Sequence, residues 1–265
     1  MKNKLLGQCA LCGKEDYLTA EHIPPEKAFN SGKIHVHDLL EDMGREQYYG
    51  NKTNPQYTIN QNGFKVYTLC SSCNNNTGSW YGDSYVEFVK QFTPIITVLH
   101  GNVNELFCGK VVDIYPLRVI KQILSMFCSI NNNDQEIADI REFVCNKESC
   151  QKLTRFRLYL YLNYSNEYKL IPFQKKITHN IDFSEIYSED TMSEIATYPL
   201  GFILSLDEKN PRDDLVDITG FADCTYGEKC DAELTIPIKE RWSPYIGDFR
   251  LKEDIMKTKE DAEHE

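Results

Sequence analysis

Two Cys-x-x-Cys pairs constrain this chain more than any other feature of its sequence. The stretch CALC places Cys9 and Cys12 near the N-terminus, and CSSC places Cys70 and Cys73 at a distant point of the chain. Each Cys-x-x-Cys turn directs two thiolates at one ion, and two such turns complete a tetrahedral Zn²⁺ site. We therefore predict one structural zinc ion bound by these four cysteines. A redox motif shares a single pair, and four unpaired core cysteines are the alternative to a metal site.

Length and composition are those of a folded intracellular protein. The chain has 265 residues, of which 41% are hydrophobic, enough for one large domain or two modest ones. No segment approaches the ~20 apolar residues of a membrane-spanning helix, and the N-terminus becomes polar too early for a secretory signal. We expect a cytoplasmic protein with no membrane contact, whose ten cysteines do not form a disulfide framework.

The hydrophobic pattern predicts a small N-terminal module, residues 1–95, that contains both cysteine pairs. Residues 17–23 and 64–70 are rich in Tyr, Thr, Val and Ile, which predicts two strands flanking a long polar loop. Ser84 and Glu87 have the spacing of a capping box, which predicts that a helix begins there and ends before Pro94.

Residues 96–251 form a second predicted part, and residues 252–265 are a charged tail that we expect to be disordered. One helix is expected to begin at Pro116 and another after Asp134. Apolar residues then alternate with polar ones, which predicts five strands, over residues 155–164, 168–173, 198–206, 214–224 and 232–238. The predicted fold class is α+β, with a zinc-stabilised N-terminal module, then helices, then a mainly antiparallel β part.

The charge distribution disfavours a simple electrostatic DNA-binding protein. The chain has 29 Lys and Arg against 40 Asp and Glu, a net charge of −11. Residues 1–90 contain 9 basic and 10 acidic residues, so the negative charge belongs almost entirely to the C-terminal part. Contact with nucleic acid would therefore depend on a local basic strip or on a bound cation.

A candidate active site lies between the two cysteine pairs. Glu21 and His22 end the first predicted strand, and a shared zinc ion would bring them beside the segment that begins at Asn74. A carboxylate, an imidazole and an amide oxygen can bind one hard divalent cation and leave a base for water. This chemistry suits metal-assisted phosphodiester hydrolysis. In the alternative interpretation His22 is structural and Asn74 forms a turn. For Asn75 and Asn76 the turn is the preferred interpretation, because asparagine tolerates positive φ.

The combination of CALC, AEHIPP and CSSCNNNTG resembles the zinc-bearing HNH endonucleases, over residues 9 to about 90. The resemblance implies a ββα-metal module in which His22 is the general base. It implies that Glu21 and Asn74 bind a catalytic Mg²⁺ or Mn²⁺, in addition to the structural Zn²⁺. It also implies a nucleic-acid substrate, expected to be DNA, and a role in restriction or antiphage defence. A zinc-stabilised nucleic-acid or protein binding module without catalysis is the alternative.

The chain departs from the family pattern at the middle asparagine. Lys65 occupies the usual position, and Asn60 or Asn62 are the candidate substitutes. Cys145 with Cys150 has a looser spacing than the two Cys-x-x-Cys pairs, so reduced cysteines are expected there.

Residues 155–164 carry the only surface predicted for a protein partner or a second copy of the chain. Their even positions form one apolar face, and their odd positions form a face with Arg155, Arg157, Tyr159, Tyr161 and Asn163. If the apolar face packs against the helices, the other face is left for a partner, since Arg and Tyr are common at interface hot spots. A solvated or doubly covered strand is the alternative.

Overall fold

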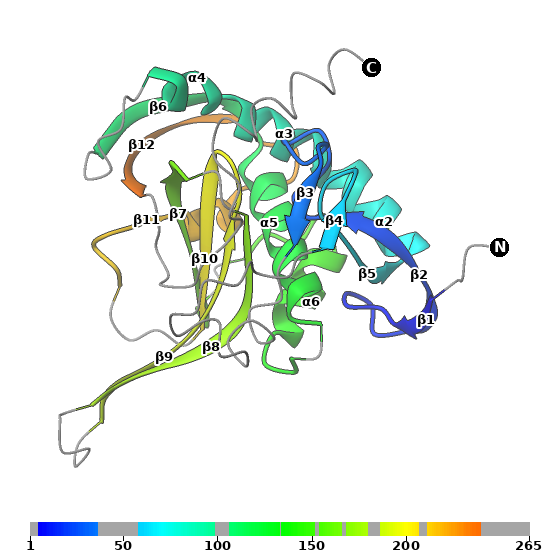
Figure 1. The fold of residues 1–265 in the computed structure, drawn as a ribbon. Helices are drawn as coiled ribbons and strands as arrows, with labels where there is room; N and C mark the ends of the chain where they lie inside the picture. The colour runs from blue at the N-terminus through cyan, green and yellow to red at the C-terminus, as the bar shows by residue number, and fades with distance from the viewer. Residues whose placement is uncertain are drawn as a thin grey trace, which may run out of the picture.

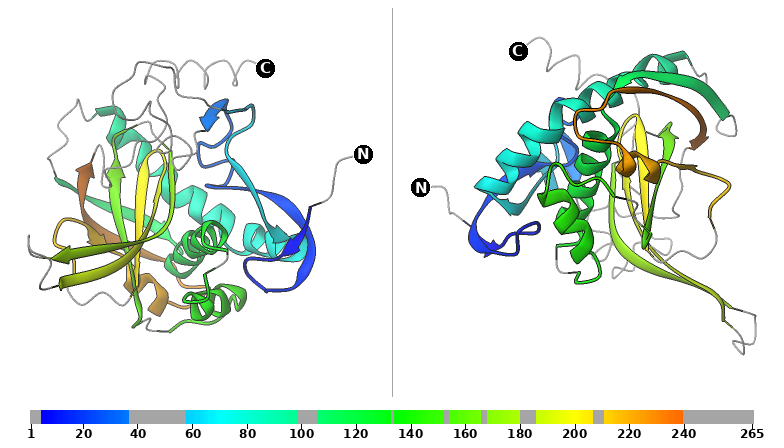
Figure 2. Two further views of the ribbon diagram at one scale, coloured as in Figure 1. Left: turned by 60° about the horizontal axis from the view of Figure 1, so that its bottom comes forward. Right: turned by 180° about the vertical axis from the view of Figure 1, so that it is seen from behind.

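The computed structural model describes residues 5–36, 58–98, 106–132, 134–151, 154–165, 168–179, 186–206 and 211–239. The fold is α+β, and its sheets are mainly antiparallel. The helix α5 (Pro116–Ile130) lies between a small N-terminal sheet and a large C-terminal sheet (Figure 1 and Figure 2). No helix within these ranges is long and apolar enough to cross a membrane.

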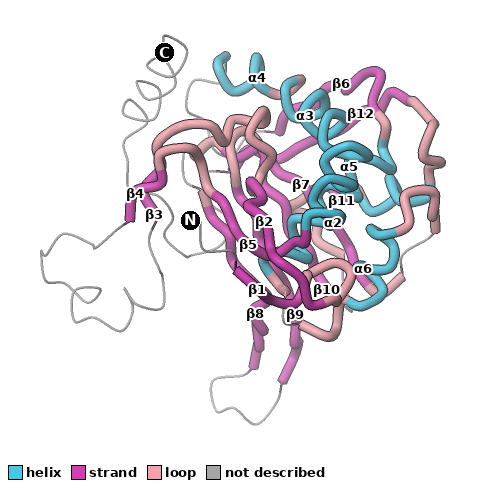
Figure 3. The backbone as a smooth tube through the Cα atoms, turned by 90° about the vertical axis from the view of Figure 1, so that its right-hand side faces the viewer, coloured by secondary structure: helices cyan, strands magenta, loops and turns pink. Residues whose placement is uncertain are grey.

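The small sheet contains both strands predicted in the N-terminal module. Strands β1 (Leu5–Gln8), β2 (Glu15–His22) and β5 (Lys65–Cys70) are antiparallel in the order β1-β2-β5. The helix α2 (Ser71–Thr77) follows β5 without a loop. The segment predicted as a polar loop also contains a short antiparallel pair, β3 (Ile34–Val36) and β4 (Thr58–Asn60), which lies apart from the helices in Figure 3.

The helix predicted to begin at Ser84 begins much earlier. Backbone angles stay helical from α2 through a π-helical turn, η2 (Gly78–Gly82), into α3 (Asp83–Lys90). Ser84 is therefore a buried mid-helix residue, and the predicted capping box is wrong. The extended residue that precedes the helix is Cys70, with φ −67° and ψ 160°. The predicted end before Pro94 is confirmed, and a further helix, α4 (Thr93–Val98), follows.

Two helices predicted in the second part are confirmed as α5 and α6 (Ala138–Cys145). Pro116 occupies the first turn of α5, where its missing N–H is no loss. Residues on every side of α5 are buried, including Leu117, Ile120 and Phe127. Burial on every side means that other elements surround the helix. This agrees with the position of α5 between the two sheets.

The large sheet has seven strands within the described ranges, in the order β6-β12-β7-β10-β9-β8, with β11 beside β7. Its pairs are antiparallel except β12 with β7. The strand bounds are β6 (Leu106–Ile114), β7 (Phe156–Asn163), β8 (Lys169–His179), β9 (Ile186–Ala196), β10 (Leu200–Leu206), β11 (Val216–Asp217) and β12 (Cys230–Lys239).

Four of the five strands predicted here are confirmed. The strand predicted over residues 214–224 is wrong, because only β11 pairs there and a 3₁₀ turn, η3 (Thr219–Asp223), follows. Strands β6 and β9 were not predicted. Their sequences lack a clear apolar alternation, since β6 is largely exposed and β9 buries Ser193 and Glu194 within the sheet.

The two tyrosines of the surface predicted on β7 for a protein partner are buried. Tyr159 and Tyr161 are 0% and 1% exposed and form a second small core with Met192, Ala196, Ile203 and Leu215. Arg157 Nη1 lies 2.8 Å from Asp217 Oδ2, so this arginine is engaged within the chain. The exposed-face prediction is therefore wrong for the tyrosines, because Leu215 packs with them and the Arg212 N–H donates to Tyr159 Oη at 3.3 Å. A protein partner of the C-terminal part stays a prediction.

One hydrophobic core connects the two predicted parts. Its buried residues extend from Cys9, in the turn after β1, to Ile238 in β12 and include residues of α3 and α5. The division at residue 95 stays a prediction, and the predicted tail lies outside the described residues.

Candidate metal centre and Glu-His site

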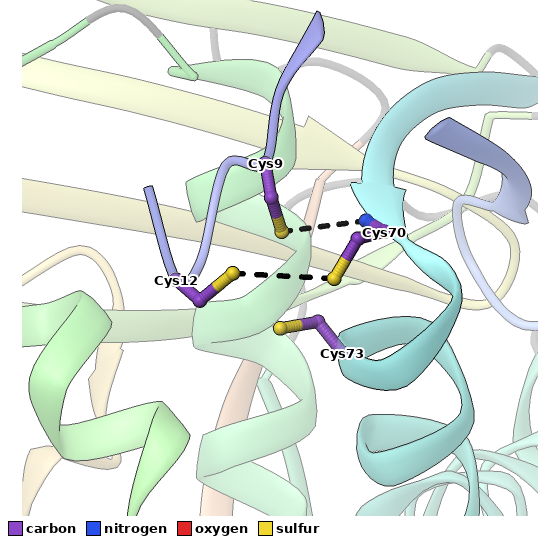
Figure 4. Close-up of side chains that lie close together, drawn as sticks. All are labelled: Cys9, Cys12, Cys70 and Cys73. Carbon is purple, nitrogen blue, oxygen red and sulfur yellow. Dashed lines mark hydrogen bonds between the residues drawn. The ribbon is translucent and has the colours of Figure 1, made fainter. Parts of the chain in front are cut away.

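The four cysteines of the two Cys-x-x-Cys pairs meet at one point. Cys9 and Cys12 lie in the turn after β1, Cys70 ends β5, and Cys73 lies in the first turn of α2 (Figure 4). Their sulfur atoms all lie within 4.8 Å of one another. The Sγ atoms of Cys12 and Cys70 are 3.9 Å apart, close to the edge of about 3.8 Å of a tetrahedron with ~2.3 Å Zn–S bonds. The cluster could therefore hold a structural metal ion such as zinc.

Backbone geometry around the cluster prepares Cys9 to be a thiolate. The Cys70 N–H donates to Cys9 Sγ at 3.3 Å, and the turn closes with Gly13 N–H donating to the Cys9 carbonyl at 2.9 Å. A hydrogen bond with the Cys73 side chain, helped by backbone N–H groups, lowers the pKa of the Cys9 thiol. Thiolates are the form that binds metal.

Cys145, the last residue of α6, lies beside this cluster. Hydrogen bonds with Cys145 and Cys9 raise the pKa of the Cys73 thiol. Cys145 is not one of the four mutually close ligands, and no other group of three or more potential ligands occurs within the described ranges. The expectation of reduced cysteines at Cys145 and Cys150 stays a prediction.

Glu21 faces the interior of the protein. Its side chain is 6% exposed, and Oε2 accepts hydrogen bonds from Ser129 Oγ at 2.6 Å and Thr68 Oγ1 at 3.3 Å. Burial raises the pKa of this carboxyl to about 7, although both hydroxyl donors oppose the rise. Near neutral pH Glu21 is therefore divided between its neutral and ionised forms.

His22 lies on the other side of β2 and is partly exposed. Its Nε2 lies 3.2 Å from the main-chain carbonyl of Asn62. A carbonyl oxygen can only accept, so Nε2 carries the proton in this contact and Nδ1 is the basic nitrogen. Burial and, after it, the charge of Lys65 lower the pKa of His22. The imidazole is therefore neutral at neutral pH and able to accept a proton.

Asn74 attaches the start of α2 to the end of β2. Its Nδ2 donates to Thr19 Oγ1 and to the Ala20 carbonyl, each at 3.0 Å. This leaves the amide oxygen as the acceptor for another group. Asn74, Asn75 and Asn76 are all helical. The prediction that Asn75 and Asn76 form a turn is therefore wrong, and so is the alternative interpretation of Asn74 as a turn residue.

An unpredicted residue, Asn30, holds the segment that carries the Asn62 carbonyl. Asn30 is 1% exposed; its Nδ2 donates to the carbonyls of Pro24 and Phe64, and its Oδ1 accepts from the Phe64 N–H. Gly63 has φ 69°, and a Cβ there would lie 2.0 Å from the Asn30 carbonyl oxygen. The sequence signal for this clamp is the Asn62-Gly63 pair, since a glycine is needed for the close approach.

The structure brings some of the candidate residues together and separates others. His22 and Asn74 are both attached to the end of β2, and Asn62, not Asn60, contacts His22, through its main chain. Asn60 instead pairs with Ile34. The Glu21 carboxylate is not brought to the His22 imidazole, because successive strand residues point to opposite faces. The metal roles of Glu21 and Asn74 stay predictions.

Comparison of the chain with protein-family models, with curated proteins and with solved structures found no match.

Proposed function

We propose that the chain is an HNH-type, metal-dependent endonuclease that hydrolyses phosphodiester bonds of nucleic acid, with DNA as the expected substrate. The observation that carries the proposal is the 3.2 Å contact between His22 Nε2 and the Asn62 carbonyl, which assigns the proton to Nε2 and leaves Nδ1 basic. Burial and the charge of Lys65 lower the pKa of this imidazole, which favours its neutral form. Its setting adds support. Two antiparallel strands and a helix meet at a four-cysteine cluster, which is the arrangement that the HNH resemblance implies.

His22 would act as the general base of this reaction. Nδ1 accepts a proton from a water molecule while the water oxygen forms a bond to phosphorus and the bond to the leaving sugar oxygen breaks. A Mg²⁺ or Mn²⁺ ion would be held by Asn74 Oδ1, which is left as an acceptor while Nδ2 donates to Thr19 and Ala20. The second ligand, Glu21, is taken from the HNH resemblance alone, because its carboxylate faces the interior, away from the His22 imidazole. Such an ion supplies stabilisation of the charge on the leaving oxygen.

The strand surface beside His22 suits a nucleic-acid substrate. His22 pairs with Lys65 and Ala20 pairs with Tyr67 across β2 and β5, so all four lie on one face of the sheet. Tyr67 is 53% exposed. Lysine pairs with phosphate and an exposed tyrosine stacks on bases, which supplies the local basic strip that a chain with net charge −11 needs. A role in restriction or antiphage defence belongs to this proposal.

One observation favours a second candidate, a zinc-stabilised binding module without catalysis. Glu21 is 6% exposed and accepts hydrogen bonds from Ser129 and Thr68. Its carboxylate therefore has a structural role in the interior of the fold that needs no cation. Activity separates the two candidates.

The test is cleavage of plasmid and single-stranded DNA, and of RNA, with Mg²⁺ or Mn²⁺ by the wild type and by His22→Ala. We expect His22→Ala to lose ~10² to 10⁴-fold in rate and to keep the zinc content and melting temperature of the wild type. His35→Ala is the matched control, because His35 lies on β3 outside the site. Wild-type protein that cleaves none of these substrates, or His22→Ala protein that cleaves normally, would overturn the proposal.

A further inference from the structure

The last turn of α5 connects the Glu-His site to the far side of the molecule. Ser129, on this turn, donates to Glu21 Oε2 at 2.6 Å. Asn131, the residue after the helix, donates from Nδ2 to Ser193 Oγ of β9 at 3.1 Å and accepts at Oδ1 from the Phe173 N–H of β8 at 2.7 Å. One rigid helix end is thus bonded both to the acid of the site and to two strands of the large sheet.

Every member of this connection is shielded from water. Glu21, Ser129, Asn131 and Ser193 are 6%, 2%, 5% and 1% exposed. Ser193 also donates to the Ile171 carbonyl of β8 at 2.7 Å, so β8 and β9 are held to α5 as a pair. A buried polar group that loses its partner costs ~1 to 3 kcal/mol. The four side chains therefore tend to move together, because breaking any one contact leaves a buried group unpaired.

The two strands lie on the opposite side of α5 from the site. Strand β8 is the edge strand at one end of the large sheet and β9 is its neighbour, and the pair extends beyond the rest of the described structure (Figure 1 and Figure 2). The small sheet with Glu21 and His22 is on the other side of the helix. A change in the position of these strands at Asn131 would therefore be passed to Glu21 through less than one turn of helix.

We propose that Ser129 is a positioning residue for the Glu21-His22 pair, and that Asn131 makes the geometry of this pair depend on strands β8 and β9. The proposal concerns the regulation of the proposed nuclease site and rests on that function. The C-terminal part of the chain thereby controls the site, with α5 as the connecting element. Ser129 touches no substrate; it acts by holding the Glu21 carboxylate, and with it the strand end that carries His22.

The chain offers a matched control for Ser129. Ser125 lies one turn earlier on α5 and is also buried, at 0% exposure, but its hydroxyl donates to the Gln122 carbonyl of its own helix at 2.8 Å. Ser129→Ala and Ser125→Ala therefore make the same chemical change in the same helix, and only the first removes a contact to Glu21. Ser129→Thr keeps the hydroxyl and is the rescue variant.

The experiment measures amide hydrogen exchange of residues 19–22 in zinc-loaded full-length protein, together with the Mn²⁺ concentration that gives half-maximal cleavage. We expect Ser129→Ala and Asn131→Ala to speed exchange at residues 19–22 by about tenfold, in line with loss of one buried hydrogen bond. We expect both to raise the half-maximal Mn²⁺ concentration several-fold, with unchanged zinc content. Ser125→Ala and Ser129→Thr should resemble the wild type in both measurements.

Two outcomes would overturn the inference. One is wild-type exchange at residues 19–22 in Asn131→Ala, which would mean that β8 and β9 do not act on the site. The other is an equal effect of Ser125→Ala and Ser129→Ala, which would mean that any buried hydroxyl on α5 matters alike. Hydrogen exchange can be measured without catalysis. A wild-type protein without nuclease activity would therefore refute the proposed function, and the exchange rates would still test whether β8 and β9 are coupled to residues 19–22.

Discussion

Replacing Glu21 with glutamine removes a titratable group that the fold buries. Burial raises the pKa of this carboxyl from 4.5 to about 7. A raised pKa in the folded state means that folding favours the protonated form. The stabilisation is complete below about pH 4.5, the unfolded-state value, and is lost as the pH rises through about 7.

The size of the effect follows from the shift. Each pKa unit corresponds to ~1.4 kcal/mol, so Glu21 should lower the free energy of unfolding of the wild type by about 2 to 3 kcal/mol between pH 5 and pH 8. Glutamine keeps the shape and a carbonyl acceptor for Ser129 and Thr68 but does not titrate. Glu21→Gln should therefore gain about 2 to 3 kcal/mol relative to the wild type over the same pH range.

Urea unfolding at pH 5 and pH 8 measures this difference. Both proteins are compared at each pH in zinc-containing buffer without Mg²⁺ or Mn²⁺, so any effect of pH on zinc binding cancels between them. Glu15→Gln is the control, because Glu15 is an exposed residue of the same strand. A stability difference between Glu21→Gln and wild type that does not change with pH would refute the assignment of Glu21 as a buried, partly protonated group.

Further predictions concern the metal centre and the base. Purified protein should contain about one zinc per chain by elemental analysis. Cys70→Ser should lose zinc and cooperative unfolding together, since a structural site couples binding to folding, whereas Cys145→Ser should keep both; zinc retained by Cys70→Ser would contradict the ligand set. Burial and the charge of Lys65 lower the pKa of His22. The cleavage rate should therefore fall only below pH ~6.5, where the base becomes protonated. Lys65→Glu should shift this fall in rate to higher pH. A rate that still rises steeply above pH 7 would exclude His22 as the base.

Local signals in the sequence predicted the elements that local forces determine. The two Cys-x-x-Cys pairs meet as predicted. Two such turns supply all four thiolates of a tetrahedral zinc site, so their spacing alone predicts that they come together. The strands over 17–23 and 64–70 and the helix from Pro116 were predicted correctly, since apolar periodicity and the terminal proline act within a few residues. The helix start at Ser84 was wrong because a capping box is only a preference, and here the cysteine turn at the end of β5 starts the helix first.

The position of each side chain in the candidate site was decided elsewhere. The sequence identifies Glu21 and His22 as neighbours, but only the packing of α5 turns Glu21 toward Ser129 and leaves His22 beside the Asn62 carbonyl. Asn30, a few residues after the motif, bonds both to Pro24 of the motif and to the distant Phe64, and so holds the segment that carries that carbonyl beside the end of β2. No pattern within a few residues records such contacts, because they depend on which distant segments the tertiary structure brings together.

The same distinction explains β7 and the metal centre. The sequence by itself determined which residues of β7 share a face and which four cysteines form the cluster. Both follow from local spacing, the alternation along a strand and the Cys-x-x-Cys pairs. Only the tertiary structure decided that Tyr159 and Tyr161 are covered and that Glu21 is buried beside Ser129. The physical reason is that spacing sets which side chains share a face, whereas burial of that face depends on the remote segment that packs against it.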